Sequence, residues 1–146
     1  MLFEEELAPV AAPELAERLG PDLRSIQDIP TSQRPTLLNY GRASPDWVDW
    51  RVCFQRLSFG DFGSWPVESL STYSQTIGEA INGRGVALGS IGLLRTELEA
   101  GVLQRIGNDV LLSGRGYYVS YDNRSVLSEG ARHLIAHLIA AAHRRP

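Results

Sequence analysis

The stretch STYSQTIGEAINGRGVALGSIGLLRTELEAGVLQRI, residues 71–106, decides the expected fold, because helical and strand patterns alternate in it with short turns between them. Ser71 or Thr72 can cap a helix over the residues that follow, and Gly83 suits the left-handed position that ends such a helix. The apolar run VALGS, residues 86–90, then predicts a buried strand. A second helix is expected from the spacing of Leu93, Leu94, Glu97 and Leu98, before Gly101 and a short apolar strand at residues 102–103.

Turn residues and apolar runs on either side of this stretch predict further elements. Pro13 can open a short helix that Gly20 ends, and Ser44-Pro45-Asp46 has the pattern of an N-cap followed by proline in the first helical turn. Residues 22–30 are expected to form a loop or a turn of helix. The other expected elements are strands at 5–11, 36–40, 67–70 and 116–121 and helices at 14–19, 47–55 and 126–143.

Composition restricts the class of protein. The chain has 146 residues, enough for one domain or slightly more, and its 43% hydrophobic and 21% charged residues are typical of a soluble globular protein. The net charge of −3, with no basic run apart from the terminal Arg144 and Arg145, argues against a nucleic-acid-binding surface.

The expected compartment is the cytoplasm. A single cysteine, Cys53, excludes an internal disulfide framework and fits a reducing environment. The first residues are acidic, whereas a signal peptide begins with positive charge, and no apolar run approaches the roughly 18 residues of a membrane span.

Four sequence features together carry a resemblance to a known family. They are EELAPVAAP near the start, the DWVDW pair of tryptophans, TIGEAINGRGVALG, and LEAGVLQRI followed by YYVSY and an apolar terminal helix. In this order and spacing they resemble the effector-binding domain of LysR-type transcriptional regulators, closest to the glycine-cleavage-activator and AmpR-like subgroup.

The resemblance implies an α/β fold of the periplasmic-binding-protein-like type II class, with a mixed sheet flanked by helices. Residues 1–107 would be the second effector-binding subdomain, and residues 108–146 would be a strand and helix that return into the first subdomain. The rest of the first subdomain and the helix-turn-helix domain that contacts DNA have no counterpart in the chain. DNA would therefore be bound only through a domain outside these residues.

The resemblance also implies a site for a small effector. Carried over by position, the ligand-binding residues would be Tyr40, Gly41, Arg42, Ser71, Thr72, Tyr73, Gly89 and Ser90. Helix N-terminal N–H groups and hydroxyls bind carboxylates well, and Arg42 could add a bidentate contact, so a small organic anion is favoured. The alternative is that Ser71 and Thr72 only cap their helix and that Arg42 is solvated.

No catalytic or cofactor motif stands out. His133 and His137 have the spacing of two helical metal ligands, but no third ligand is evident and a solvated pair is favoured. In GRGVALG the glycines follow a helix and precede a strand, the reverse of the dinucleotide-binding order. The chain is therefore expected not to be an enzyme and to need no metal or cofactor.

The expected terminal helix carries an apolar stripe that needs a covering surface. Its members are Val126, Leu127, Leu134, Ile135, Leu138, Ile139 and Ala142. Self-association through this helix and the strand before it is the prediction, so a homo-oligomer is expected. Two other functions stay open at this point: a ligand receptor like the solute-binding proteins, and a stand-alone oligomerisation module that does not bind DNA.

Overall fold

The computed structural model describes residues 1–26, 29–41, 48–122 and 126–143. The chain divides into two compact units. The larger unit comprises residues 6–113, and the smaller comprises residues 1–5 and 114–146. Within the described residues, no helix has the length and apolar character needed to span a bilayer.

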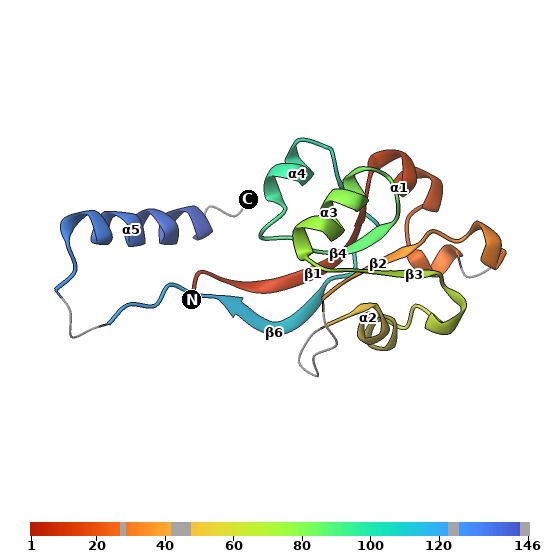
Figure 1. The fold of residues 1–146 in the computed structure, drawn as a ribbon, viewed down its shortest axis with the longest axis horizontal. Helices are drawn as coiled ribbons and strands as arrows, with labels where there is room; N and C mark the ends of the chain where they lie inside the picture. The colour runs from red at the N-terminus through yellow and green to blue at the C-terminus, as the bar shows by residue number, and fades with distance from the viewer. Residues whose placement is uncertain (27–28, 42–47, 123–125, 144–146) are drawn as a thin grey trace. The chain divides into compact units, whose positions relative to one another are not determined.

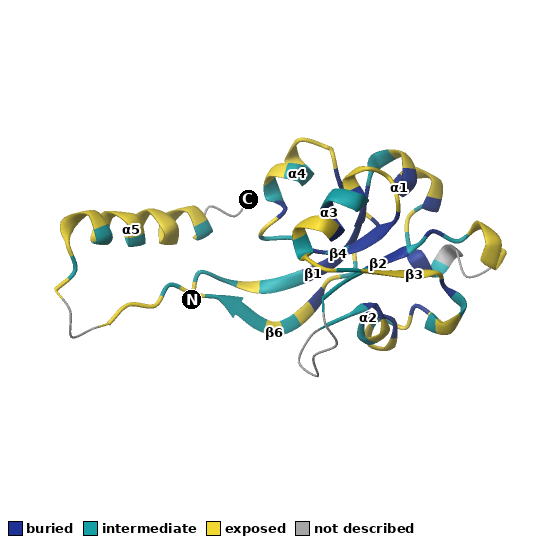
Figure 2. Cartoon of the chain, in the orientation of Figure 1, coloured by how far each residue is buried: buried dark blue, intermediate teal, exposed yellow. Residues whose placement is uncertain are grey.

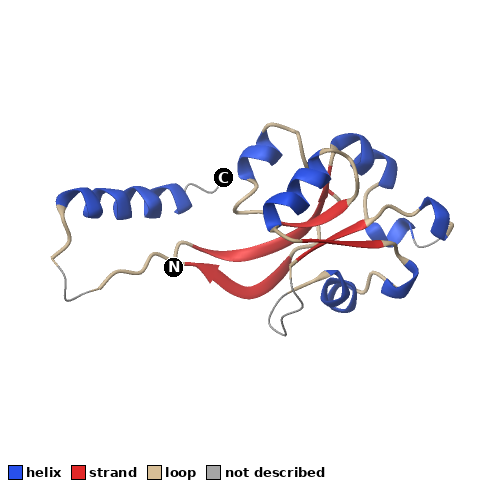
Figure 3. Ribbon diagram, in the orientation of Figure 1, coloured by secondary structure: helices blue, strands red, loops and turns tan. Residues whose placement is uncertain are grey.

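A mixed sheet runs through the fold, as predicted (Figure 3). Its strands are β1 (Phe3–Ala11), β2 (Leu37–Tyr40), β3 (Val67–Leu70), β4 (Val86–Ser90), β5 (Gln104–Arg105) and β6 (Leu111–Tyr117). The spatial order is β3-β2-β4-β1-β5, and β6 also pairs with β1. Strand β2 is parallel to both β3 and β4, whereas β1 is antiparallel to β4 and β5.

The chain has helices in both units. They are α1 (Pro13–Leu19), α2 (Trp50–Leu57), α3 (Tyr73–Ile81), α4 (Arg95–Glu99) and α5 (Glu129–His143), with short 3-10 helices at Leu23–Ile26, Thr31–Gln33 and Phe62–Ser64. In the larger unit, α3 and α4 lie on the opposite side of the sheet from α2 (Figure 1). The helix at 14–19 and the helix over residues 73–81 confirm the sequence predictions.

The alternation of side chains along the strands divides the core into two clusters. Val10, Leu38 and Ala87 pack with side chains of α3 and α4. Their neighbours along the same strands, including Leu37 and Val86, pack with side chains of α1 and α2. The buried residues therefore concentrate in the sheet and its covering helices in the larger unit (Figure 2).

Helix α2 begins later than predicted. Its N-cap is Asp49, whose carboxylate accepts a hydrogen bond from the Val52 backbone N–H at 2.9 Å, so the helix starts at Trp50 and extends to Leu57. The proposed cap Ser44-Pro45-Asp46 lies outside the described residues. The predicted start at residue 47 is wrong because Asp49 caps the helix two residues further on.

The last two strands also differ from the predicted positions. The backbone N–H groups of Val102 and Leu103 donate to the Glu97 carbonyl and complete the turn after α4, so strand pairing with β1 begins at Gln104. Strand β6 spans residues 111–117 instead of 116–121. Its first residue, Leu111, belongs to the core, and its last, Tyr117, accepts from the Leu2 backbone N–H at 2.6 Å.

The smaller unit contains the longest helix among the described residues, α5. It begins at Glu129 instead of residue 126, because the Ser128 hydroxyl accepts from the Ala131 backbone N–H at 3.2 Å and acts as its cap. No side chain of α5 is buried. In the same unit, the Phe3 ring stacks on Tyr117 with ring centroids 4.7 Å apart.

Candidate functional site

Three neighbouring parallel strands end at the same edge of the sheet. The register pairs Tyr40, the last residue of β2, with Leu70, the last residue of β3. The backbone N–H of Gly41 continues this pairing by donating to the Leu70 carbonyl at 3.2 Å. Strand β4, also parallel to β2, ends with Ser90. In open α/β sheets, ligands bind outside the carboxyl ends of such strands.

The N-terminus of α3 lies at this edge because the helix follows directly on β3. Thr72 has an extended backbone conformation, and its hydroxyl oxygen accepts from the Gln75 backbone N–H at 3.1 Å. Thr76 donates from its hydroxyl to the Thr72 carbonyl at 3.0 Å. Thr72 is therefore the N-cap of α3, one of the two candidates that the sequence offered, and Ser71 is exposed beside it.

Tyr73 connects the first turn of α3 to the ends of β2 and β4. Its hydroxyl oxygen accepts from the Ser90 backbone N–H at 3.0 Å. Its ring meets the Tyr40 ring edge-on, with centroids 5.8 Å apart. An edge-to-face pair of this kind is stabilising beyond the area that it buries. The structure therefore brings Tyr40, Gly41, Thr72, Tyr73 and Ser90 together at one edge.

The end of β4 is closely packed. Ser90 is 1% exposed, and its hydroxyl oxygen has no hydrogen-bond partner among the described atoms. Gly89 is buried, and a side chain there would place its Cβ 2.5 Å from a Leu94 methyl carbon and 2.8 Å from a Val10 methyl carbon. The neighbouring side chains therefore leave no room for a Cβ at Gly89. Any ligand contact at this position would use its backbone.

Arg42, the predicted cationic contact, lies outside the described residues. The rest of the predicted set falls on four connected segments: the end of β2, the loop before α3, the first turn of α3 and the end of β4. Two oxygen-bearing side chains, those of Tyr73 and Thr72, already take part in interactions that hold these segments together.

Asn39 has a positioning role that the sequence reasoning missed. Its side-chain oxygen accepts from the Trp50 backbone N–H at 3.2 Å, and the Trp50 indole N–H donates to the Leu38 carbonyl at 3.0 Å. These two bonds attach the start of α2 to β2, next to Tyr40. The sequence feature that could have indicated this role is the single amide side chain, that of Asn39, inside the apolar run TLLNY.

A second polar cluster stabilises the larger unit away from the strand ends. The Arg24 guanidinium donates to Asp22 at 2.7 Å, to Asp109 at 2.5 Å and to the Leu57 carbonyl at 2.5 Å, and it lies 4.8 Å from the centre of the Phe59 ring. Hydrogen bonds to Asp109 and Asp22 raise the pKa of Arg24 further above its already high ordinary value. Arg24 thereby connects segments that are far apart in sequence.

Metal-ligating groups do not gather in the described part of the chain. No set of three or more His, Cys, Asp or Glu side chains with metal-binding geometry occurs there. The one cysteine, Cys53, is fully buried in the core, and burial raises the pKa of its thiol to about 12. The site is thus defined by hydroxyls, backbone N–H groups and aromatic rings.

Two curated proteins are similar to the chain in sequence. The uncharacterised HTH-type transcriptional regulator y4mQ of Sinorhizobium fredii is 32% identical over 124 residues, covering 82% of this chain and 37% of the relative. The glycine cleavage system transcriptional activator of Escherichia coli is 30% identical over 129 residues, covering 88% of this chain and 40% of the relative. The chain thus spans about two fifths of the length of these relatives. No protein-family model matches it.

Solved structures of regulator domains share the fold. The effector-binding domain of AmpR from Citrobacter freundii superposes with a TM-score of 0.62 at 14% identity, covering 99% of this chain and 66% of that one. The effector domain of AmpR from Pseudomonas aeruginosa gives 0.57 at 21% identity, covering 97% and 63%. Full-length LysG from Corynebacterium glutamicum, solved with bound effector Arg, gives 0.54 at 14% identity, covering 99% and 47%.

The fold is therefore that of an effector-binding domain of the periplasmic-binding-protein-like class. The homologues of the chain are LysR-type transcriptional regulators, and the chain matches the effector-binding domains of that family over most of its length.

Proposed function

We propose that this chain binds the effector of a LysR-type transcriptional regulator at the carboxyl ends of β2, β3 and β4. The observation that supports this most is the link from Tyr73, in the first turn of α3, to the Ser90 backbone N–H at the end of β4. This hydrogen bond joins the first turn of α3 to the end of β4, so the hydroxyl-bearing residues Tyr73 and Ser90 lie together at the carboxyl ends of the parallel strands. The relatives' role as transcriptional regulators supports this function over a transport receptor or a stand-alone oligomerisation module.

The proposed ligand is a small organic anion. An α-helix N-terminus carries a partial positive charge, and its first-turn N–H groups are natural donors to a carboxylate. Ser71 precedes the N-cap of this helix, the Tyr73 hydroxyl lies at the end of β4, and both hydroxyls can add neutral hydrogen bonds. We propose the predicted set Tyr40, Gly41, Arg42, Ser71, Thr72, Tyr73, Gly89 and Ser90 as ligand-contacting or ligand-positioning residues.

The remaining parts of the proposal concern the whole regulator. DNA is contacted by a helix-turn-helix domain outside the residues of this chain, in the bacterial cytoplasm. The chain itself performs no catalysis, because its proposed role is ligand sensing. Self-association through α5 accompanies this role, since apolar side chains of that helix are exposed.

A thermal-shift panel tests ligand class and site together. Small carboxylates and amino acids are expected to raise the melting temperature, whereas the corresponding neutral amides and amines are not, because only the anions complement the start of α3. Tyr73→Phe should reduce the rise in melting temperature that carboxylates cause. The reason is that the Ser90 N–H loses its acceptor, so the end of β4 is no longer held to α3. Tyr118→Phe, an exposed tyrosine in the smaller unit, is the matched control. Stabilisation by neutral or cationic compounds alone would contradict the anionic ligand.

Arg42 needs a separate test in the intact regulator. Replacing Arg42 with Ala is expected to weaken effector binding by about tenfold, the effect of losing one charge-assisted contact. If Arg42→Ala binds the effector with unchanged affinity, Arg42 is not part of the site. That result would not bear on ligand binding at the N-terminus of α3, which the thermal-shift panel tests.

A further inference from the structure

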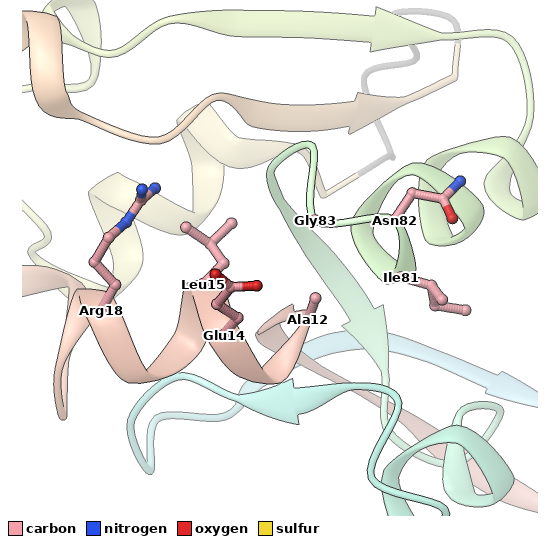
Figure 4. A pocket seen from close by; sticks show the side chains of 7 residues that line it. All are labelled: Ala12, Glu14, Leu15, Arg18, Ile81, Asn82 and Gly83. Carbon is pink, nitrogen blue, oxygen red and sulfur yellow. The ribbon is translucent and has the colours of Figure 1, made fainter.

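A pocket of about 590 Å³ lies at the C-terminal end of α3, whereas the strand ends just described adjoin the N-terminus of this helix. One wall comes from α1 and the other from the C-terminal turn of α3, where Ile81, Asn82 and Gly83 end the helix (Figure 4). A volume of this size is within the range of small-molecule pockets. None of the eight proposed effector-site residues lines it.

Two opposite charges line the α1 wall. Glu14 and Arg18 are four residues apart, so both project from the same side of this short helix. Within the described residues, neither takes part in an ion pair. Both charges are thus available to a ligand that carries an anionic and a cationic group.

The α3 wall adds a region of negative potential. The carbonyl groups at a helix C-terminus carry partial negative charge, which a cation normally complements. Helix α3 has no basic residue in its last turn, and the nearby Arg84 is paired with Glu79 at 3.0 Å. A ligand ammonium group between Glu14 and this helix end would be stabilised from both sides.

Two apolar residues also line the pocket. Leu15, 6% exposed, forms part of the pocket lining from α1, and Ile81 contributes to the lining from the end of α3. Figure 4 shows the Glu14 carboxylate on the side of α1 nearest to Asn82 and the Arg18 guanidinium further along the same helix.

We propose that this pocket is a second binding site, and that it takes a small zwitterion such as a free amino acid. Glu14 and the C-terminal end of α3 receive the ammonium group, and Arg18 receives the carboxylate. Because α3 runs from the proposed effector site to this pocket, the two sites share one helix.

A backbone-amide NMR titration of the full chain with L-leucine tests the proposal. The expected result is saturable shifts at Glu14, Leu15, Arg18, Asn82 and Gly83. Isocaproate, which lacks the ammonium group, and isoamylamine, which lacks the carboxylate, should each bind about tenfold more weakly, because each loses one charge-assisted contact.

Matched variants complete the test. Glu14→Gln and Arg18→Gln should each weaken leucine binding by about tenfold. Glu17→Gln on α1 and Arg56→Gln on α2 remove exposed charges outside the pocket and should leave binding unchanged. Equal binding of leucine and its two analogues, or unchanged binding in both pocket variants, would overturn the proposal.

The location of the shifts separates this proposal from the proposed function. Leucine shifts confined to Thr72, Tyr73 and Ser90 would place the ligand at the effector site and refute the second site. Absence of any shift at millimolar leucine would also refute it. Neither result bears on whether other carboxylates bind at the start of α3.

Discussion

Thr72 has a structural role that can be measured apart from any ligand. Its hydroxyl accepts from the Gln75 N–H, so Thr72→Ala should lower the free energy of unfolding by about 1 kcal/mol, whereas Thr72→Ser should retain most of it. Urea denaturation measures the difference. If Thr72→Ala has wild-type stability, the cap is not formed in solution. If Thr72→Ala is destabilised yet binds the effector normally, Thr72 is a cap alone and not a ligand contact.

Cys53 predicts a dependence of stability on alkaline pH. Burial raises the pKa of the folded thiol from 9.0 to about 12, so the unfolded chain loses this proton first. The stabilising contribution is therefore complete below pH 9 and is lost as the pH rises toward 12. Urea denaturation at several pH values measures the decline, and Cys53→Ala should show a smaller one. Equal pH dependence of the two proteins would contradict the burial.

The Arg24 cluster should contribute more to stability than an ordinary surface ion pair. Asp109→Asn removes the charge that Arg24 contacts through both terminal nitrogens and is expected to cost about 1–2 kcal/mol, because charge-assisted bonds in a network exceed isolated pairs. The control is Glu79→Gln, which breaks the more exposed pair with Arg84 and should cost about 0.5 kcal/mol or less. Equal losses in the two variants would contradict a special role for the Arg24 cluster.

At the scale of the elements, periodicity and caps predicted the larger unit well. The helix before Gly83, the strand VALGS and the helix opened by Pro13 all occur where turn residues and apolar spacing placed them. The predicted starts of α2 and α5 are wrong because Asp49 and Ser128, further along the chain, cap these two helices. The boundaries of β6 depend on pairing with β1, a contact between residues far apart in the sequence that local patterns do not encode.

Helix α5 carries the prediction of self-association. Leu134, Leu138 and Ile139 are 59%, 37% and 44% exposed and lie along one side of the helix. Light scattering should therefore give a mass above the 16.1 kDa of one chain. Replacing Leu134 and Leu138 with Gln should reduce this mass, whereas Ala136→Gln with Ala140→Gln, on the other side of α5, should not. A monodisperse monomer at high concentration would refute the prediction.

At the scale of the whole molecule, the resemblance carried by short motifs predicted more than residue patterns alone. It placed Tyr40, Thr72, Tyr73 and Ser90 in one site, although they are distributed over 51 positions of sequence from 40 to 90. Parallel pairing of β2 with β3 and β4 is the physical reason that they meet. The Tyr73 to Ser90 hydrogen bond and the positioning role of Asn39 depend on side-chain geometry, and no spacing rule in the sequence specifies them.

We propose that a small organic anion binds at the carboxyl ends of β2, β3 and β4. Backbone-amide NMR mapping of the full chain, titrated with a panel of small carboxylates, tests it most directly. At least one carboxylate is expected to shift Gly41, Thr72, Tyr73 and Ser90 in a saturable way and to lose this effect when it is converted to its neutral amide. If every carboxylate leaves these amides unchanged, or shifts only residues elsewhere in the chain, the strand ends are not the effector site.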